Sequence, residues 1–470
     1  MTKCLVQERK ITYKGQVMGK KILLICNYFA PDHTIAAVRT SKLTKYLQKD
    51  GYEVEVITER KNAELEDEIL KRDIIGIKTY YAANSRLFIK ISSLYKKIME
   101  PHKKKRFDNL DNRNRLNPKT GKVEFYPFET AYPIWGSLDY LMGLLKQYDL
   151  FRSVKSLLGQ LDGFDYVITS YGDAFSIYAG RYYHRCHKEI PWIFDIRDAI
   201  YRYKFTPNYV KWIAEKYEHD IWKNADCILG VSKGICKRVP VKYRHKVHCL
   251  TNGFDLSDRQ GLTGERLNTS NMVFTYTGSM YGGLVNLSVF FASISQAAQQ
   301  GLVKPDEIEF HFAGNDPAFE IFKDQARKYG LDHRCITHGK LSRKDAMQLQ
   351  QQSDFLLVAS YDYQNNEGGV ITGKTLEYMA AGRPIIALVM GDIEHSELAD
   401  IIRKSGLGIA YEDSHKEKDF ELLCRYLGMK YKEFTETGAV SHMPDVKGLR
   451  KYDYKNLGKR LVGIINQIGK

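Results

Sequence analysis

Short apolar runs alternate with helical stretches along most of this 470-residue chain, and this alternation limits the folds it can adopt. Strands separated by helices predict parallel sheets built from β-α-β units, so we expect an α/β fold. In the first half, strands are expected at 21–26, 52–58, 166–170, 192–196, 227–231 and 246–250. In the second half, they are expected at 272–278, 308–314, 335–339, 354–360 and 384–389. Helices are expected between them, for example at 37–51 and 211–225.

The strand series restarts near residue 272, after a polar, glycine-containing link. A chain of this length exceeds the size at which one hydrophobic core stops growing, so two doubly wound, Rossmann-like domains are expected. The predicted boundaries are a flexible extension at 1–20, a first domain at 21–255 with a basic insert at 86–135, a second domain at 256–445, and a C-terminal helix at 446–470 that could cross back to the first domain. Two such domains would face each other across a cleft, which is a preferred place for a ligand.

The composition is that of an ordinary globular protein, with 43% hydrophobic and 27% charged residues. The eight cysteines show no paired C-x-x-C spacing and fall mostly in apolar runs, which favours reduced thiols and a cytoplasmic setting. His184 and His187 have no further ligand set beside them, so no metal site is predicted. No secretory signal is recognised and no apolar run reaches the length of a membrane span.

The net charge of +15 requires that acidic partners be considered. Residues 103–122 hold eight basic and two acidic residues, and residues 86–100 before them form an amphipathic pattern. Its apolar stripe consists of Leu87, Ile91, Leu94, Tyr95 and Ile98, with Lys90, Lys96 and Lys97 outside it. Two interpretations stay open: an element that contacts an anionic membrane, or a helix packed on its own domain with a solvated loop behind it. A nucleic-acid partner is not predicted, because we recognise no binding motif with interleaved aromatic residues.

Residues 368–375, GGVITGKT, match the phosphate-loop pattern G-x-x-x-x-G-K-[ST]. That pattern needs a buried strand that runs into the first glycine and a long helix after the lysine. Here the nearest predicted strand ends eight residues earlier, and Gly382 and Pro384 end the helix soon after Lys374. A nucleotide triphosphatase is therefore not favoured.

The start of this helix still suits an anion. Lys374 and Glu377 lie on one helical face, and a lysine in the first turn opposes the helix dipole. An anion bound by the free N–H groups of Gly373 to Thr375 would remove that disadvantage. The alternative is a lysine–glutamate pair on the surface.

Six segments, in this order, resemble the retaining group 1 (family 4) glycosyltransferases of bacterial surface-polysaccharide assembly, which have the GT-B fold. They are 21–58, WIFDIRDAI (192–200), EKYEHDIWKNADCILGVSKGI (215–235), LTNGFD (250–255), YTGSMYGG (276–283) and TGKTLEYMAAGRPIIAL (372–388). The resemblance implies a nucleoside-diphosphate sugar as donor, with its ribose on Glu377 and its diphosphate on Lys374 and the helix start. The remaining donor-side residues would be Gly278, Ser279, Thr372, Gly373, Thr375 and, as a substitute cation, Arg343.

The resemblance places Asp198, Arg39 and the loop with Asp32 and His33 on the acceptor side. It implies transfer with retention, in which the departing phosphate helps to deprotonate the acceptor hydroxyl, and no metal or cofactor. The expected acceptor is a saccharide or a lipid-linked saccharide at the inner face of the membrane. A sugar-nucleotide epimerase or a phosphorylase-like enzyme of the same fold is the alternative.

The chain departs from the family pattern in three places. The E-x₇-E pair is missing, because Gly369 stands eight residues before Glu377 and the nearest acid is Glu367. No arginine–lysine pair follows Gly278, and Ala36 and Ala37 replace a glycine pair. These differences bear on individual contacts to the donor sugar more than on the class of enzyme.

Overall fold

The computed structural model describes residues 19–61, 66–107, 114–116, 123–125, 133–198, 200, 207–280, 285–360, 371–391 and 393–468. All but the last two residues of the predicted extension 1–20 lie outside this part of the chain. Most of the basic loop and the start of the phosphate-loop pattern also lie outside it. Glu367 and Gly369 are among these residues.

The first domain is built on a seven-stranded parallel sheet with the order β3-β2-β1-β6-β7-β8-β9. Its strands are β1 (Lys21–Cys26), β2 (Glu53–Glu59), β3 (Lys78–Ala82), β6 (Tyr166–Ser170), β7 (Trp192–Ile196), β8 (Cys227–Gly230) and β9 (Val247–Cys249). Ile22 and Leu24 pack toward one face of the sheet, and Leu23 and Ile25 toward the other. A strand buried on both faces is an unbroken apolar run, which explains why β1 was readily predicted.

Helices cover both faces of this sheet. The helices of the first domain are α1 (Ile35–Lys49), α2 (Glu68–Asp73), α3 (Arg86–Phe107), α5 (Pro133–Gln160), α6 (Ala174–Cys186), α7 (Asn208–Asn224) and α8 (Lys233–Arg238). Side chains of α1 belong to the core on one face, and side chains of α5 and α6 to the core on the other. The insert contains α3, whose chain continues to a short antiparallel pair, β4 (Asn114–Leu116) and β5 (Val123–Phe125).

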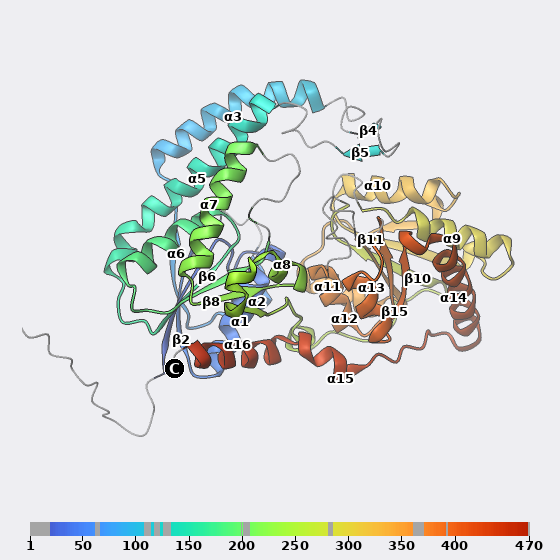
Figure 1. The fold of residues 1–470 in the computed structure, drawn as a ribbon. Helices are drawn as coiled ribbons and strands as arrows, with labels where there is room; N and C mark the ends of the chain where they lie inside the picture. The colour runs from blue at the N-terminus through green and yellow to red at the C-terminus, as the bar shows by residue number, and fades with distance from the viewer. Residues whose placement is uncertain are drawn as a thin grey trace, which may run out of the picture.

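The second domain has a six-stranded parallel sheet with the order β12-β11-β10-β13-β14-β15. Its strands are β10 (Met272–Thr277), β11 (Ile308–Ala313), β12 (Cys335–Thr337), β13 (Phe355–Ser360), β14 (Ile385–Val389) and β15 (Gly408–Glu412). Its helices are α9 (Ser288–Gln299), α10 (Asp316–Arg327), α11 (Arg343–Gln352), α12 (Gly373–Ala381), α13 (Glu397–Lys404) and α14 (Lys416–Thr437). The two domains lie side by side (Figure 1). The prediction of two doubly wound parallel-sheet domains is confirmed.

The end of the chain returns to the first domain. After α14, the chain passes through α15 (Val446–Leu449) to α16 (Tyr454–Ile468), which lies beneath the first sheet in Figure 1. Leu457 and Leu461 of α16 join the same core as Leu43 and Leu47 of α1. The crossing point needs a glycine, because a Cβ on Gly253 would lie 2.4 Å from the carbonyl oxygen of Tyr452.

Within the part of the chain that the structure describes, no helix combines the length and apolar character needed to cross a membrane.

Candidate active site

A cavity of about 190 Å³ lies between the two domains, at the carboxyl ends of the parallel strands. The first domain contributes the start of α1 and the segment after β7, and the second contributes α11 and α12. The starts of α1 and α12 approach closely, since a Cβ on Gly373 would lie 2.9 Å from Cγ1 of Ile35. Two helix N-termini, each the positive end of a helix dipole, therefore meet at this cavity.

Helix α12 begins and ends where the sequence predicted. Thr372 is its N-cap, and its hydroxyl accepts a hydrogen bond of 3.3 Å from the N–H of Thr375. Gly382 ends the helix with a φ of 69°, in the left-handed region that favours glycine. The buried hydroxyl of Tyr378 accepts a hydrogen bond of 3.0 Å from the N–H of Thr277. This bond holds α12 against the carboxyl end of β10.

Lys374 points toward β10 and the turn that follows it. Its Nζ lies 2.5 Å from the hydroxyl of Tyr276 and 4.1 Å from the centre of that ring. Among the described residues, Lys374 makes no ion pair, and burial lowers its pKa from 10.5 to about 7. Gly278, with a φ of 120°, lies beneath the amine, since a Cβ there would be 2.8 Å from Nζ. Lys374 and Gly278, two of the predicted donor-side residues, thus lie against each other.

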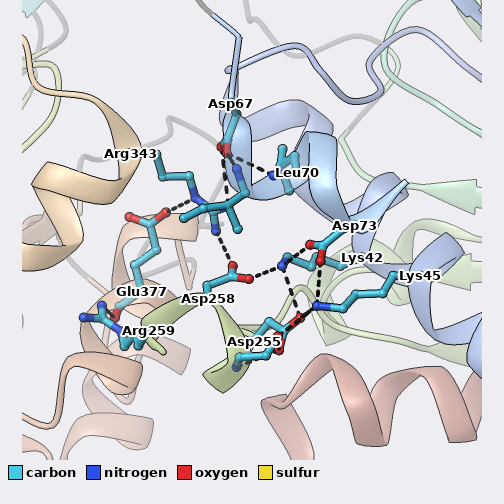
Figure 2. A network of polar contacts seen from close by, with 12 residues as sticks. Lys42, Lys45, Asp67, Leu70, Asp73, Asp255, Asp258, Arg259, Arg343 and Glu377 are labelled. Carbon is cyan, nitrogen blue, oxygen red and sulfur yellow. Dashed lines mark hydrogen bonds and ion pairs between the residues drawn. The ribbon is translucent and has the colours of Figure 1, made fainter. Parts of the chain in front are cut away.

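Glu377 lies one turn further along α12 and faces Arg343, the first residue of α11 (Figure 2). Nε of Arg343 is 3.5 Å from Oε1 of Glu377, Nη2 is 3.1 Å from Asp258, and Nη1 is 3.5 Å from Asp67. Burial alone would lower the pKa of Arg343, but the three carboxylates raise it above its ordinary value. Arg343 was predicted as a cation for the donor, yet its charge is already balanced by carboxylates from both domains and the junction.

A second cluster joins the same network. Lys42 and Lys45 of α1 bind Asp73 and Asp255, and Lys42 also binds Asp258 (Figure 2). Asp73, Asp255 and Asp258 lie close enough together to hold a cation, and the lysine ammonium groups fill that role here. Although burial acts to raise it, the lysines hold the pKa of Asp255 well below its usual range. The polar network therefore runs from α1 through the junction to Glu377.

Arg39 supports the wall of the cavity. Its guanidinium binds both carboxylate oxygens of Asp195, at 3.0 and 2.7 Å, and donates to the carbonyls of Leu250 and Thr251. Only 1% of Arg39 is exposed, so its N–H groups donate hydrogen bonds to groups within the protein. In this arrangement Arg39 acts as a positioning residue that joins α1, β7 and the domain junction.

The other predicted acceptor-side residues lie further out. Asp198 is exposed and borders both the interdomain cavity and a neighbouring one of about 200 Å³ that Thr372 and Gly373 also line. His33 is exposed in the loop before α1 and lines neither cavity. Ser279 is exposed, and its carbonyl accepts a hydrogen bond of 2.8 Å from Tyr276.

Sequence reasoning missed several residues of this site: Asp67, Asp195, Asp258, Arg259, Tyr276 and Tyr378. Arg259 donates to the carbonyl oxygen of Glu377 at 2.8 Å, and burial lowers its pKa to about 10. The sequence did carry a signal for Asp195, because this residue lies in the segment WIFDIRDAI, three residues before the predicted site residue Asp198. The contacts of Asp67 and Arg259 join residues far apart in the chain and left no local pattern.

Comparison with known proteins identifies the second domain. Residues 271–418 match the family model of the glycosyl transferases group 1. The second domain is similar to the group 1 glycosyltransferases. None of the curated protein sequences matches the chain at a significant level.

Solved structures are similar over almost the whole chain. The N-terminal domain of Candida albicans trehalose-6-phosphate phosphatase aligns with a TM-score of 0.57 and 12% identity, covering 98% of this chain and 100% of that one. Sucrose-phosphate synthase from Thermosynechococcus elongatus gives 0.54 and 13%, covering 96% and 99%. The lipopolysaccharide outer core galactosyltransferase WaaB gives 0.54 and 14%, covering 95% and 99%. The chain has the GT-B fold. The interdomain cavity described above lies where the two domains of this fold face each other.

Proposed function

We propose that this chain is a glycosyltransferase that moves a sugar from a nucleoside-diphosphate sugar to an acceptor hydroxyl. The observation that supports this proposal most directly is that Lys374 and Glu377 lie on one helix at the interdomain cavity, within the region that matches the group 1 glycosyltransferases. A buried amine that makes no ion pair with any described residue, next to a helix N-terminus, suits a diphosphate. A carboxylate one turn away suits the hydroxyls of a ribose.

Each group has a role in the reaction. As the bond between the sugar and the diphosphate breaks, negative charge grows on the leaving oxygen. The Lys374 ammonium and the first N–H groups of α12 stabilise that charge, so a resident metal or cofactor is not required by this proposal. The acceptor oxygen attacks the same face of the sugar, and the departing phosphate takes the acceptor proton. Configuration is then retained.

The acceptor side belongs to the first domain. Asp198 borders the cavity opposite α12 and is the candidate for orienting the acceptor hydroxyl. We propose that the donor sugar is a hexose or an N-acetylhexosamine and that the acceptor is a lipid-linked saccharide in cell-surface polysaccharide assembly. Such an acceptor would bring a cytoplasmic enzyme to the inner face of a membrane, and α3 carries the basic and apolar residues that suit this surface.

The proposal is tested first by ligand-induced stabilisation. Nucleotide sugars are screened for a rise in the melting temperature of the wild-type protein, because binding to the native state stabilises it by about 2.7 kcal/mol at a hundredfold excess over Kd. The donor found in this way is then incubated with candidate acceptors. A donor that is converted without any acceptor would indicate an epimerase, and the absence of stabilisation by every nucleotide sugar would contradict the proposal.

A further inference from the structure

Over residues 86–99, the part whose side chains the structure describes, helix α3 packs on the protein through one face. Phe88, Ser92 and Tyr95 are half-buried and Met99 is 2% exposed, and these four residues follow one another along a single stripe of the helix. The hydroxyl of Tyr95 donates a hydrogen bond of 2.8 Å to Asp139 of α5. This inner stripe accounts for the packing of α3.

A neighbouring face of α3, about 100° around the helix from the inner stripe, is apolar as well. We call Leu87, Ile91, Leu94 and Ile98 the outer stripe; they are 69%, 47%, 61% and 53% exposed. The sequence pattern had placed Tyr95 in this stripe, and the structure corrects that prediction by turning Tyr95 inward. An ordinary surface helix turns its apolar stripe toward the core, so a second stripe in solvent needs another explanation.

The charges beside the outer stripe have one sign. Arg86, Lys90 and Lys97 lie along one edge of the outer stripe, Lys96 lies on the far side of the helix, and all four are exposed. Over its whole length α3 carries eight lysine or arginine residues and one glutamate. An exposed apolar stripe flanked by cations fits a surface that offers both acyl chains and anionic headgroups.

The position of α3 agrees with such a contact. In Figure 1, α3 lies along the outer edge of the first domain, above α5 and away from both sheets. The neighbouring α5 and α7 are joined by a hydrogen bond of 2.7 Å from the hydroxyl of Tyr209 to the carbonyl of Ser137. Trp212 of α7 is 56% exposed, with the Lys216 ammonium 3.4 Å from the centre of its ring. An exposed tryptophan with a nearby lysine suits the headgroup region of a membrane.

We propose that the outer stripe of α3 docks the first domain on an anionic lipid bilayer, with the helix lying in the plane of the interface. A second copy of this chain is a poorer occupant, because pairing two outer stripes would bring the exposed cations of both copies together. The inference rests on the packing and charge of α3 and does not require the proposed transfer reaction. If both hold, docking would bring the acceptor side of the enzyme to a membrane that carries lipid-linked saccharides.

The test uses co-sedimentation of the full chain with vesicles of phosphatidylcholine alone and with phosphatidylglycerol added. The wild type is expected to bind the anionic vesicles, and Leu87→Ser with Leu94→Ser to lose about tenfold in partitioning. Lys90→Gln with Lys96→Gln and Lys97→Gln should lose a similar amount at low salt and less at high salt. All these side chains are exposed, so the melting temperature should not change.

A matched control is Leu422→Ser with Met429→Ser on α14, which removes two exposed apolar side chains from the second domain and should leave binding unchanged. Equal binding of wild type and outer-stripe variant, or no binding of wild type to anionic vesicles, would overturn the inference. So would a dimer in solution that Leu87→Ser with Leu94→Ser converts to a monomer. Donor-induced stabilisation is measured without lipid. A negative result in the vesicle experiment therefore does not affect the test of the proposed function.

Discussion

Nε of Arg343 lies 3.5 Å from Oε1 of Glu377, and the same guanidinium reaches Asp67 of the first domain and Asp258 of the junction. One cation therefore links the carboxylate expected to hold the donor ribose to the opposite domain. A donor that draws Glu377 away from Arg343 would change the balance of charges between the domains. Arg343 therefore connects Glu377, the predicted ribose-binding residue, to the junction and to the first domain.

Replacing Glu377 by alanine is expected to abolish transfer while the fold persists. The side chain is 20% exposed, and Arg343 keeps two other carboxylates, so the protein should remain folded. Loss of the charge-assisted contacts to the ribose should reduce kcat/KM by about 100-fold or more. Steady-state kinetics with the identified donor check this, and Glu436→Ala on the surface of α14 is the matched control. Full activity of Glu377→Ala would remove the donor-site assignment.

Binding of the donor should take up a proton at Lys374. Burial lowers the pKa of Lys374 to about 7, so at pH 8 most free protein carries a neutral amine. A diphosphate would raise that pKa and draw up to about one proton from the buffer. Calorimetric titration at pH 8 in Tris and in HEPES should give enthalpies that differ by the buffer ionisation heats. In Lys374→Met this difference should vanish; a wild-type enthalpy independent of buffer would refute the prediction.

The same pKa predicts how stability depends on pH. Lys374 binds its proton less tightly in the folded protein than in the unfolded chain, where its pKa is near 10.5. Between about pH 7 and 10.5 the unfolded state holds more protons, so this residue makes stability rise with pH. Lys374→Met should therefore exceed the wild type in free energy of unfolding most near pH 7. The net gain, after the loss of the contacts with Tyr276, should be on the order of 1 kcal/mol. Urea unfolding at several pH values measures this gain, which should shrink toward pH 10.

Alanine at Gly278 should damage the donor site. A Cβ there would approach Nζ of Lys374 to 2.8 Å, and the φ of 120° is strained for any residue with a side chain. The strain should cost about 1–3 kcal/mol, and displacement of Lys374 should weaken donor binding. Gly264→Ala is a suitable control, because its Cβ would meet only Gln351, at 3.9 Å. Equal donor affinity in Gly278→Ala and Gly264→Ala would show that the turn does not hold Lys374.

Truncation of Arg39 should destabilise the fold rather than a ligand complex. Arg39→Ala leaves the buried carboxylate of Asp195 with the Ser170 hydroxyl but without its ion-pair partner, which should cost about 3–5 kcal/mol of unfolding free energy. Arg425→Ala breaks an exposed pair with Glu421 on α14 and should cost no more than about 1 kcal/mol. Chemical denaturation of both variants makes the comparison. Unchanged stability together with lost acceptor binding would restore Arg39 as an acceptor contact.

Local pattern was enough to predict much of this molecule. All eleven expected strands occur to within two residues at each end, because a strand covered on both faces is a continuous apolar run. The edge strands β3 and β15 were missed, since their sequences KTYYA and GIAYE lack such a run. The sequence also grouped Thr372, Gly373, Lys374 and Glu377, because a helix brings residues within one turn together; their role in donor binding stays a prediction.

Only the tertiary structure decided which distant groups meet. Arg39 and Asp195 are 156 positions apart, and Arg343 gathers carboxylates from three separate segments. Periodicity within α3 revealed an apolar stripe but could not decide that Tyr95 turns inward while its neighbours stay in solvent. Helical spacing is a property of the local backbone, whereas the partner that a face meets depends on packing between elements far apart in the chain.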